Sequence, residues 1–390
     1  MSNLNAGCPQ TGRAAYRISA HRISIGLASA IALGLGSCTA PPASNNLEAQ
    51  TPPAASEPSA PELQVVTTFV PMTQFTKAVA GDRAEVTQLL PPNVGPHDYQ
   101  ARPEDAQRLA QADVLVKNGL EMESFLDNLI QNAENENLNV IDTSESIETI
   151  TTDSIAGDAH GADPDHGHNH DHDHAHENGE IPEAAHAHEH GEFNPHIWLD
   201  PKRAIQQVEN IRDGLIAADP DGQAVYTANA AAYIQQLQAL DAEITQQLQP
   251  FANQTFVAFH DFAPYFAQSY GLKAEFLVDV PDVNPSPEDV KRVIETVQSS
   301  SLKTLLTEPQ SGEDVFTALA KDLNVQISMF DPMEAGGVEA LQPEHYLTTM
   351  RQNVKTLVSA FAGESAQSGL LRWTRPQTTA VLPQPVGWRF

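Results

Sequence analysis

The amino-acid sequence predicts an α/β protein of two lobes, each a parallel sheet flanked by helices, joined by one long rigid helix. Short apolar segments alternate with amphipathic helical segments from residue 63 to 133 and again from residue 255 to 361. Strands that alternate with helices pair in parallel, with helices on both faces of the sheet. A single helical run, Asp221 to Gln249, lies between the two stretches. At 1.5 Å per residue it reaches about 40 Å, which is long enough to connect two lobes.

The first 37 residues have the order of a secretory signal peptide. Three arginines precede an apolar run from Ile23 to Leu35, and small residues follow it. The run is shorter than the roughly 20 apolar residues that a helix needs to cross a bilayer. We therefore expect cleavage and export, to a periplasmic or extracytoplasmic location, and no permanent membrane span.

The leader ends in Leu35-Gly36-Ser37-Cys38, which resembles the bacterial lipobox. In such a motif the cysteine is lipidated and becomes the mature N-terminus, so we expect Cys38 to be the only attachment to the membrane. Residues 38–62 are rich in Pro, Ala, Ser and Glu, which predicts a flexible tether. Removal of Cys8 with the leader would leave no cysteine for a disulfide or a thiolate metal site.

The charge balance of the chain narrows the range of partners. The 390 residues carry 51 acidic and 21 basic side chains, a formal net charge of −30, and 41% of the residues are hydrophobic. The hydrophobic content is sufficient for a sizeable core. The acidic excess argues against nucleic acid and anionic lipid, because both attract clusters of Lys and Arg. We expect cations as partners.

The N-terminal lobe is predicted at residues 63–218. Its expected strands are Leu63–Phe69, Ala84–Leu90 and Val114–Lys117, and its expected helices are Pro103–Ala112, Glu121–Ala133 and Pro201–Ala218. Asp200 is the expected cap of the last helix, with Pro201 at its first position. The bridging helix is then assigned to residues 219–250.

The C-terminal lobe is predicted at residues 251–363. Its expected strands are Thr255–Phe259, Ala274–Val278, Leu302–Leu306 and Val325–Met329. Its expected helices are Phe262–Tyr270, Pro287–Ser299, Glu313–Leu323 and Glu344–Phe361. Residues 364–390 lack periodicity and are expected to form an irregular tail.

Residues 157–192 interrupt the N-terminal lobe with ten of the fifteen histidines, ten acids and no Lys or Arg. Such a segment cannot form a core and predicts a disordered loop. Nine of its histidines are expected auxiliary metal ligands: His166, His168, His170, His172, His174, His176, His186, His188 and His190. Binding there must order the chain at about 1–2 kcal/mol per residue, so its affinity should be weak. A solvated tract without selected function is the alternative.

Three isolated histidines lie where elements end or begin. His97 follows a strand in a Pro/Gly-rich loop, His196 precedes a helix, and His260 follows the strand Thr255–Phe259. Ligands in open α/β sheets bind beyond the carboxyl ends of strands, so these residues can converge on one crevice. Three imidazoles and one carboxylate suit tetrahedral zinc, and Asp331 after the last strand is the carboxylate candidate. Hydrogen-bonded scaffolding for the histidines and an Asp-Pro turn for Asp331 remain alternatives.

Five motifs occur in order along the chain: Val65-Val66-Thr67-Thr68-Phe69-Val70-Pro71, Gly95-Pro96-His97, Pro195-His196-Ile197-Trp198-Leu199-Asp200-Pro201, Phe259-His260-Asp261 with Tyr265-Phe266 and Tyr270-Gly271-Leu272, and Thr307-Glu308-Pro309-Gln310. Together they resemble the metal-receptor family of zinc and manganese ABC importers. The resemblance extends from about Leu63 to Phe361.

The resemblance implies two αβ lobes with the ion between them and His97, His196 and His260 as ligands. It also places Asp331 where members with four protein ligands carry an aspartate. Some zinc receptors use a Glu just before the first histidine, but here that position is Pro96. The fourth ligand is therefore expected to be Asp331 or a water.

Glu308 sits where the family has a carboxylate that orients a ligating imidazole through its other nitrogen. The alternative for Glu308 is an ordinary strand-end surface acid.

The function implied is that of a monomeric receptor, not an enzyme, which captures zinc outside the cytoplasmic membrane and delivers it to the permease of an ABC importer. Receptors for manganese replace the third histidine by a carboxylate, so His260 favours zinc, copper or nickel. The alternatives are a receptor for manganese or another divalent metal, an adhesin-like metal buffer, and a zinc hydrolase. A hydrolase would need an open coordination position and a general base, and no H-E-x-x-H motif occurs.

Overall fold

The computed structural model describes residues 63–97, 99–152, 191–281, 284–300, 302, 304–309 and 313–363. The predicted signal peptide, Cys38, the tether, the nine histidines of the His-rich segment and the predicted tail lie outside these residues. Within the described ranges, no helix combines the length and the apolar character needed to span a membrane.

The N-terminal sheet contains four parallel strands in the order β2-β1-β3-β4. The strands are β1 (Leu63–Thr67), β2 (Ala84–Gln88), β3 (Val114–Lys117) and β4 (Asn139–Asp142). Val114, Leu115 and Val116 of β3 are all buried, as expected of a parallel strand that is covered on both faces. The helices of this lobe are α1 (Val70–Ala80), α2 (Pro103–Gln111), α3 (Leu126–Ala133) and α5 (Pro201–Ala218).

Two elements of this lobe were absent from the sequence prediction. Helix α1 buries the polar side chains of Thr73, Gln74 and Thr76 together with its apolar ones, so it has no amphipathic pattern. In strand β4 only Ile141 is buried, because the strand forms the edge of the sheet. Neither segment shows the periodicity from which sequence prediction works.

The C-terminal sheet is also parallel, and its order β6-β5-β7-β8 repeats that of the first sheet. Its strands are β5 (Thr255–His260), β6 (Lys273–Val278), β7 (Thr304–Thr307) and β8 (Gln326–Met329). Its helices are α7 (Pro264–Tyr270), α8 (Pro287–Ser299), α9 (Glu313–Leu323) and α10 (Pro343–Ala362). All correspond to predicted elements, with ends that differ by a few residues.

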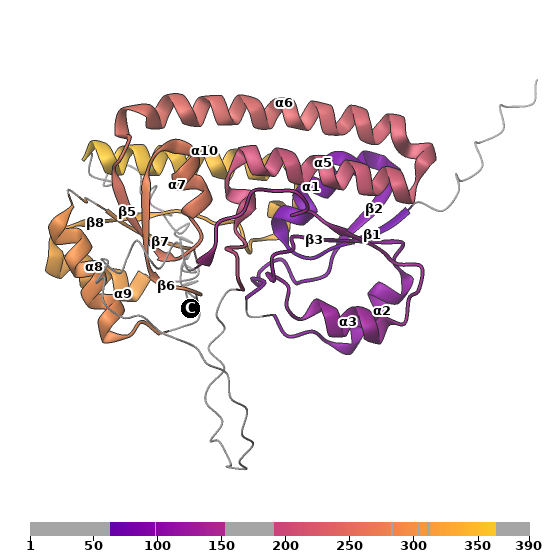
Figure 1. The fold of residues 1–390 in the computed structure, drawn as a ribbon, viewed down its shortest axis with the longest axis horizontal. Helices are drawn as coiled ribbons and strands as arrows, with labels where there is room; N and C mark the ends of the chain where they lie inside the picture. The colour runs from indigo at the N-terminus through magenta and orange to yellow at the C-terminus, as the bar shows by residue number, and fades with distance from the viewer. Residues whose placement is uncertain are drawn as a thin grey trace, which may run out of the picture. The chain divides into compact units, whose positions relative to one another are not determined.

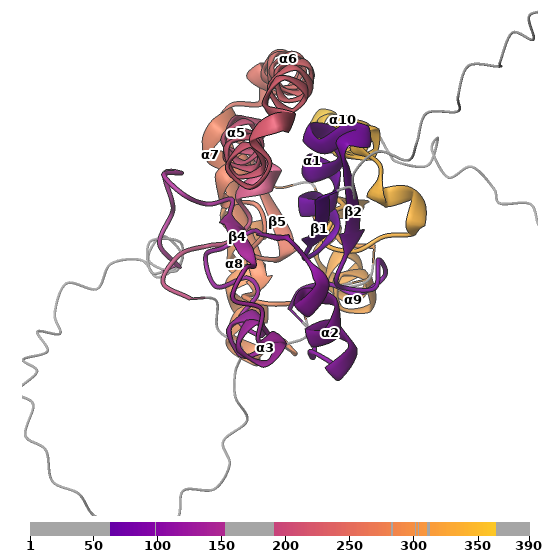
Figure 2. The ribbon, with the colours of Figure 1, turned by 90° about the vertical axis from the view of Figure 1, so that its right-hand side faces the viewer.

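The long helix α6 (Gln223–Leu248) connects the two lobes (Figure 1). It packs against α1 and α5 of the N-terminal lobe and against α10 of the C-terminal lobe. Figure 2 shows it nearly end-on, above α5 on one side and α10 on the other. Its buried residues recur every three to four positions: Tyr226, Ala230, Tyr233, Leu237, Leu240, Ile244 and Leu248. The predicted fold class of two helix-flanked parallel sheets and a long helix is therefore confirmed.

One hydrophobic core extends through both lobes. It includes Val65 and Leu115 of the first sheet and Phe256 and Ala258 of the second. Val257, which alternates with them on β5, faces a smaller core that also contains Val293 of α8 and Phe316 of α9. The shared core fixes the carboxyl ends of strands from the two sheets near each other, and the functional side chains lie there.

Candidate metal centre

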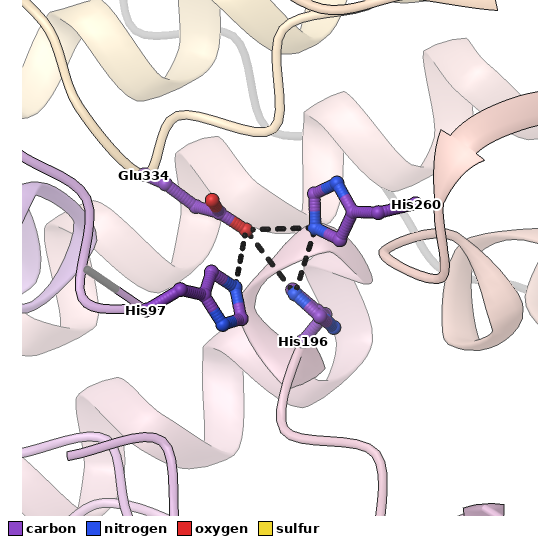
Figure 3. A group of neighbouring side chains, drawn as sticks. All are labelled: His97, His196, His260 and Glu334. Carbon is purple, nitrogen blue, oxygen red and sulfur yellow. Dashed lines mark hydrogen bonds and ion pairs between the residues drawn. The ribbon is translucent and has the colours of Figure 1, made fainter. Parts of the chain in front are cut away.

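Four side chains from distant parts of the chain meet at one point (Figure 3). His97 lies in the loop after β2, His196 precedes the short helix η2 (Ile197–Leu199), His260 ends β5, and Glu334 lies in the loop after β8. Each offers one ligand atom, and these atoms lie within 4.8 Å of one another. The structure thus brings together the three histidines singled out from the sequence, two from the N-terminal lobe and one from the C-terminal lobe, with a carboxylate from the C-terminal lobe.

The distances within this group are short and similar. Oε1 of Glu334 lies 3.3 Å from Nε2 of His97 and 3.1 Å from Nε2 of both His196 and His260. The two latter Nε2 atoms are 3.2 Å apart. Ligand atoms of a tetrahedral ion with bonds of about 2.0 Å are separated by about 3.3 Å. These four distances are close to that separation, and the remaining ligand atoms lie within 4.8 Å of one another.

His260 is oriented by Glu308, which directly follows strand β7. Oε1 of Glu308 accepts the backbone N–H of His260 at 3.1 Å and lies 2.8 Å from its Nδ1. The same oxygen accepts the backbone N–H, so it also accepts from Nδ1, which carries a proton and leaves Nε2 as the nitrogen that faces Glu334. Glu308 thus lies against the ring of His260, and its role beside a bound metal stays a prediction.

His196 is oriented by Asn194, a residue that sequence analysis did not single out. Oδ1 of Asn194 accepts the backbone N–H of His196 at 3.0 Å and lies 3.1 Å from its Nδ1. Because Oδ1 can only accept, Nδ1 of His196 must be the donor. Its Nε2 lone pair then faces Glu334 and His260.

Burial and charge act against each other at these side chains. His196 and His260 have no exposed surface, and Glu334 is 8% exposed. Burial lowers the pKa of His196 to about 3, which keeps this ring neutral. Burial also acts to lower the pKa of His260, but Glu308 and Glu334 outweigh it and hold that pKa well above its usual range. Burial acts to raise the pKa of Glu334, but His97 and His260 hold it well below the usual range, so the carboxylate is ionised.

The positions of these ligand atoms favour a bound cation. Nε2 of both imidazoles and a carboxylate oxygen converge, while the Nδ1 protons of both imidazoles point away from the centre. The raised pKa of His260 favours a proton on its Nε2 beside the carboxylate of Glu334, and a bound cation would take the place of that positive charge. Nitrogen ligands with one carboxylate are the donor set that suits zinc, copper or nickel.

Asp331, the carboxylate predicted from the sequence, is outside this group. Its Oδ1 accepts the backbone N–H of Met333 at 2.8 Å, and its own backbone pairs with the side chain of Asn353. Asp331 therefore closes the turn after β8, and burial raises its pKa. The turn carries Glu334, three residues later, into the centre in its place.

The comparisons with known proteins agree with this architecture. The profile of a family described as "ZnuA: Zinc-uptake complex component A periplasmic" matches residues 65–360. The zinc-binding lipoprotein AdcA of Streptococcus pneumoniae is 31% identical over 338 residues, which are 86% of this chain and 60% of that protein. The manganese-binding lipoprotein MntA of Halalkalibacterium halodurans is 29% identical over 306 residues, 77% of this chain and 89% of that protein. The chain thus spans about 60% of the length of the AdcA relative.

Solved structures give the same fold. The Zn(II)-bound ZnuA-like domain of Streptococcus pneumoniae AdcA aligns with a TM-score of 0.60 and 28% identity over 77% of this chain and 99% of that one. The laminin-binding adhesin Lmb of Streptococcus agalactiae, in a mutant form, aligns with a TM-score of 0.62 and 25% identity over 77% and 99%.

Proposed function

This chain belongs to the family of periplasmic zinc-uptake complex component A, and from that premise we propose that it captures zinc outside the cytoplasmic membrane and delivers it to an ABC-type importer. In this proposal the ion is the cargo, and His97, His196, His260 and Glu334 hold it. The partner that receives it is the membrane permease of the importer.

The convergence of three imidazoles and one ionised carboxylate carries the proposal. Zinc accepts a tetrahedral shell of nitrogen and oxygen without geometric penalty, whereas manganese prefers oxygen ligands and higher coordination. The name of the AdcA relative agrees with zinc, and that of the MntA relative supports manganese as the second candidate.

Two features of the site favour a transport receptor that acts as a monomer. Four protein ligands complete a tetrahedral shell, whereas a catalytic zinc keeps one position open for water or substrate. All four side chains also come from one chain, so the site needs no second copy.

The His-rich segment is proposed as an auxiliary weak binding region, and the structure shows how to remove it. The chain on either side of it is joined by an isolated antiparallel bridge, in which the backbone N–H of Thr152 donates to O of Glu192 at 3.1 Å and that of Asn194 donates to O of Ile150 at 2.9 Å. Replacement of residues 155–190 by a short Gly-Ser linker leaves these pairs in place, and with them the position of His196.

Zinc titration of the parent and of this deletion variant tests the proposed function. We expect one tight site in both proteins, with preference for zinc over manganese. The parent should show several additional weak sites at pH 7.5 that are lost near pH 6, because imidazoles with pKa values of about 6.5 become protonated.

Three outcomes would contradict parts of this proposal. Absence of a tight zinc site from the parent would exclude the receptor function, and tighter manganese binding would favour the second candidate. Loss of the tight site on deletion would mean that the segment supplies a primary ligand.

Attachment to the membrane through a lipid on Cys38 is the last part of the proposal. The motif Leu35-Gly36-Ser37-Cys38 supports it, and both curated relatives are named lipoproteins. We expect Cys38→Ser to move the protein out of the membrane fraction, because acyl chains hold it there. Cys8→Ser is the matched control and should not change the fractionation. Mass analysis that finds Cys38 unmodified in the mature protein would refute the anchor.

A further inference from the structure

The two buried imidazoles of the metal centre are held in the same geometry by partners of different charge. In each case one oxygen accepts both the backbone N–H and the ring Nδ1–H of the same histidine. For His260 this oxygen belongs to the carboxylate of Glu308, at 3.1 and 2.8 Å. For His196 it belongs to the neutral amide of Asn194, at 3.0 and 3.1 Å. In both rings Nδ1 therefore carries a proton and Nε2 faces the centre, but the two rings differ in basicity as ligands.

The amide of Asn194 is fixed in its orientation by all of its contacts. Nδ2 donates to the backbone O of Asp261 at 2.8 Å and to its Oδ2 at 3.0 Å. The backbone O of Asn194 accepts the hydroxyl of Tyr265 at 2.7 Å, which holds the residue itself in place. A flipped amide would set NH₂ against the N–H of His196 and oxygen against the oxygens of Asp261. Oδ1 must therefore face His196.

Oδ1 of a carboxylate lies close to His196 but beyond hydrogen-bond distance of its Nδ1. Oδ1 of Asp261 is 3.9 Å from Nδ1 of His196, and this aspartate is only 4% exposed. The amide of Asn194 bonds to both residues. A carboxylate bonded directly to a ligating imidazole raises the basicity of the ligand and strengthens its bond to the metal. At Nδ1 of His196 the bond is made by the neutral amide of Asn194 and not by this carboxylate, so the increase in basicity is smaller.

We propose that Asn194 is a positioning residue that fixes the tautomer of His196 with a neutral acceptor and holds Asp261 away from the ring, so that His196 is the weaker ligand and the ion can be released. The inference rests on the proposed receptor function, because a receptor must give up its cargo to the permease. His260, oriented by Glu308, is then the more firmly bound ligand of the pair.

Two variants of the full chain test this role. Asn194→Ala removes the acceptor, and we expect zinc affinity to fall about 10-fold or more, as for other outer partners of ligating histidines.

The exchange variant Asn194→Asp with Asp261→Asn keeps the net charge and the hydrogen bond between the two side chains, and it loses the bond to the backbone carbonyl of residue 261. It brings a carboxylate directly against His196, so zinc should dissociate into excess chelator several-fold more slowly than from the parent.

A spectroscopic readout separates positioning from a general structural role. In metal-free protein labelled with ¹⁵N-histidine, the signal of His196, identified by its loss in His196→Gln, should show the Nδ1–H tautomer in the parent and a mixture in Asn194→Ala. Asn210→Ala is the matched control, since the amide of Asn210 bonds to the backbone oxygens of Thr143 and Glu145, away from the site. It should behave as the parent.

The inference is overturned if Asn194→Ala matches the Asn210→Ala control in affinity and tautomer, or if the exchange variant releases zinc as fast as the parent. Should Asn194→Ala fail to fold, the exchange variant still decides, because it keeps an oxygen against His196. Failure of the parent itself to bind zinc would instead refute the proposed function, and the tautomer measured without metal would still test the role of Asn194.

Discussion

Glu334→Gln is expected to weaken zinc binding by roughly 100- to 4,000-fold. Oε1 of Glu334 is the atom shared by all three histidines, and the carboxylate is the only negative charge within the group of four. Removal of one charged partner from a buried pair costs about 3–5 kcal/mol, and each 1.4 kcal/mol is a factor of ten in affinity. The change is isosteric, so the loss reports charge and not volume. Competitive titration against a chelator measures it.

Asp331→Asn is the matched control for this prediction. Its side chain accepts the backbone N–H of Met333, and an amide oxygen can accept the same bond. We expect its zinc affinity to stay within about threefold of the parent, or about 0.7 kcal/mol, since the bond to Met333 is kept and Asp331 lies outside the group of four. A large loss in Asp331→Asn with little change in Glu334→Gln would restore the carboxylate assignment made from the sequence.

Trp198→Ala is expected to lower the free energy of unfolding of the metal-free protein by about 3–5 kcal/mol. The side chain has no exposed surface and packs edge-on against Phe69 at 5.1 Å between ring centroids. Its Nε1–H donates to O of Pro332 at 2.8 Å, and its backbone O accepts the hydroxyl of Tyr346 at 2.7 Å. One residue thus joins η2 to both the N-terminal lobe and the loop that carries Glu334. Urea unfolding measures the change.

Met329→Ala provides the comparison for Trp198→Ala. Met329 is 55% exposed, so its truncation should alter the free energy of unfolding by about 0.5 kcal/mol or less. A loss of under about 1 kcal/mol in Trp198→Ala would mean that the cavity collapses and that the contacts of this ring with the two lobes contribute little.

Elements with strong local signals were predicted from the sequence. Strand β3 is a short run of apolar residues, and helix α5 begins at Pro201 behind the cap Asp200, whose side chain accepts the N–H of Lys202 at 3.2 Å. Helix α1 and strand β4 were missed because their polarity is set by neighbours distant in sequence. Gln74, for example, is buried because its Nε2 donates to O of Ala340, 266 residues away.

The chemical types at the candidate metal centre were also visible in the sequence, but not all of its residues were. His97, His196 and His260 lie at element boundaries, where the topology of a parallel sheet brings side chains together. Glu334 lies five residues beyond the end of β8, in a loop without periodicity, and Asn194 has no metal-ligating chemistry of its own. Neither carries a local signal from which its position could be inferred. The lipid on Cys38, the role of the His-rich segment and the domain limits stay predictions.

The sequence by itself determined the alternation of strands and helices, and it singled out the three histidines and Glu308 as candidates, because each depends on a local pattern or on a residue at the end of a strand. Only the tertiary structure decided which carboxylate of the loop after β8 enters the centre. That choice depends on packing between two loops: the backbone N–H of Gly336 donates to O of Pro92 at 2.6 Å, which holds the Glu334 loop against the loop of His97. A contact between residues 244 positions apart has no signature in either segment alone, since it forms only once both sheets are folded around their shared core.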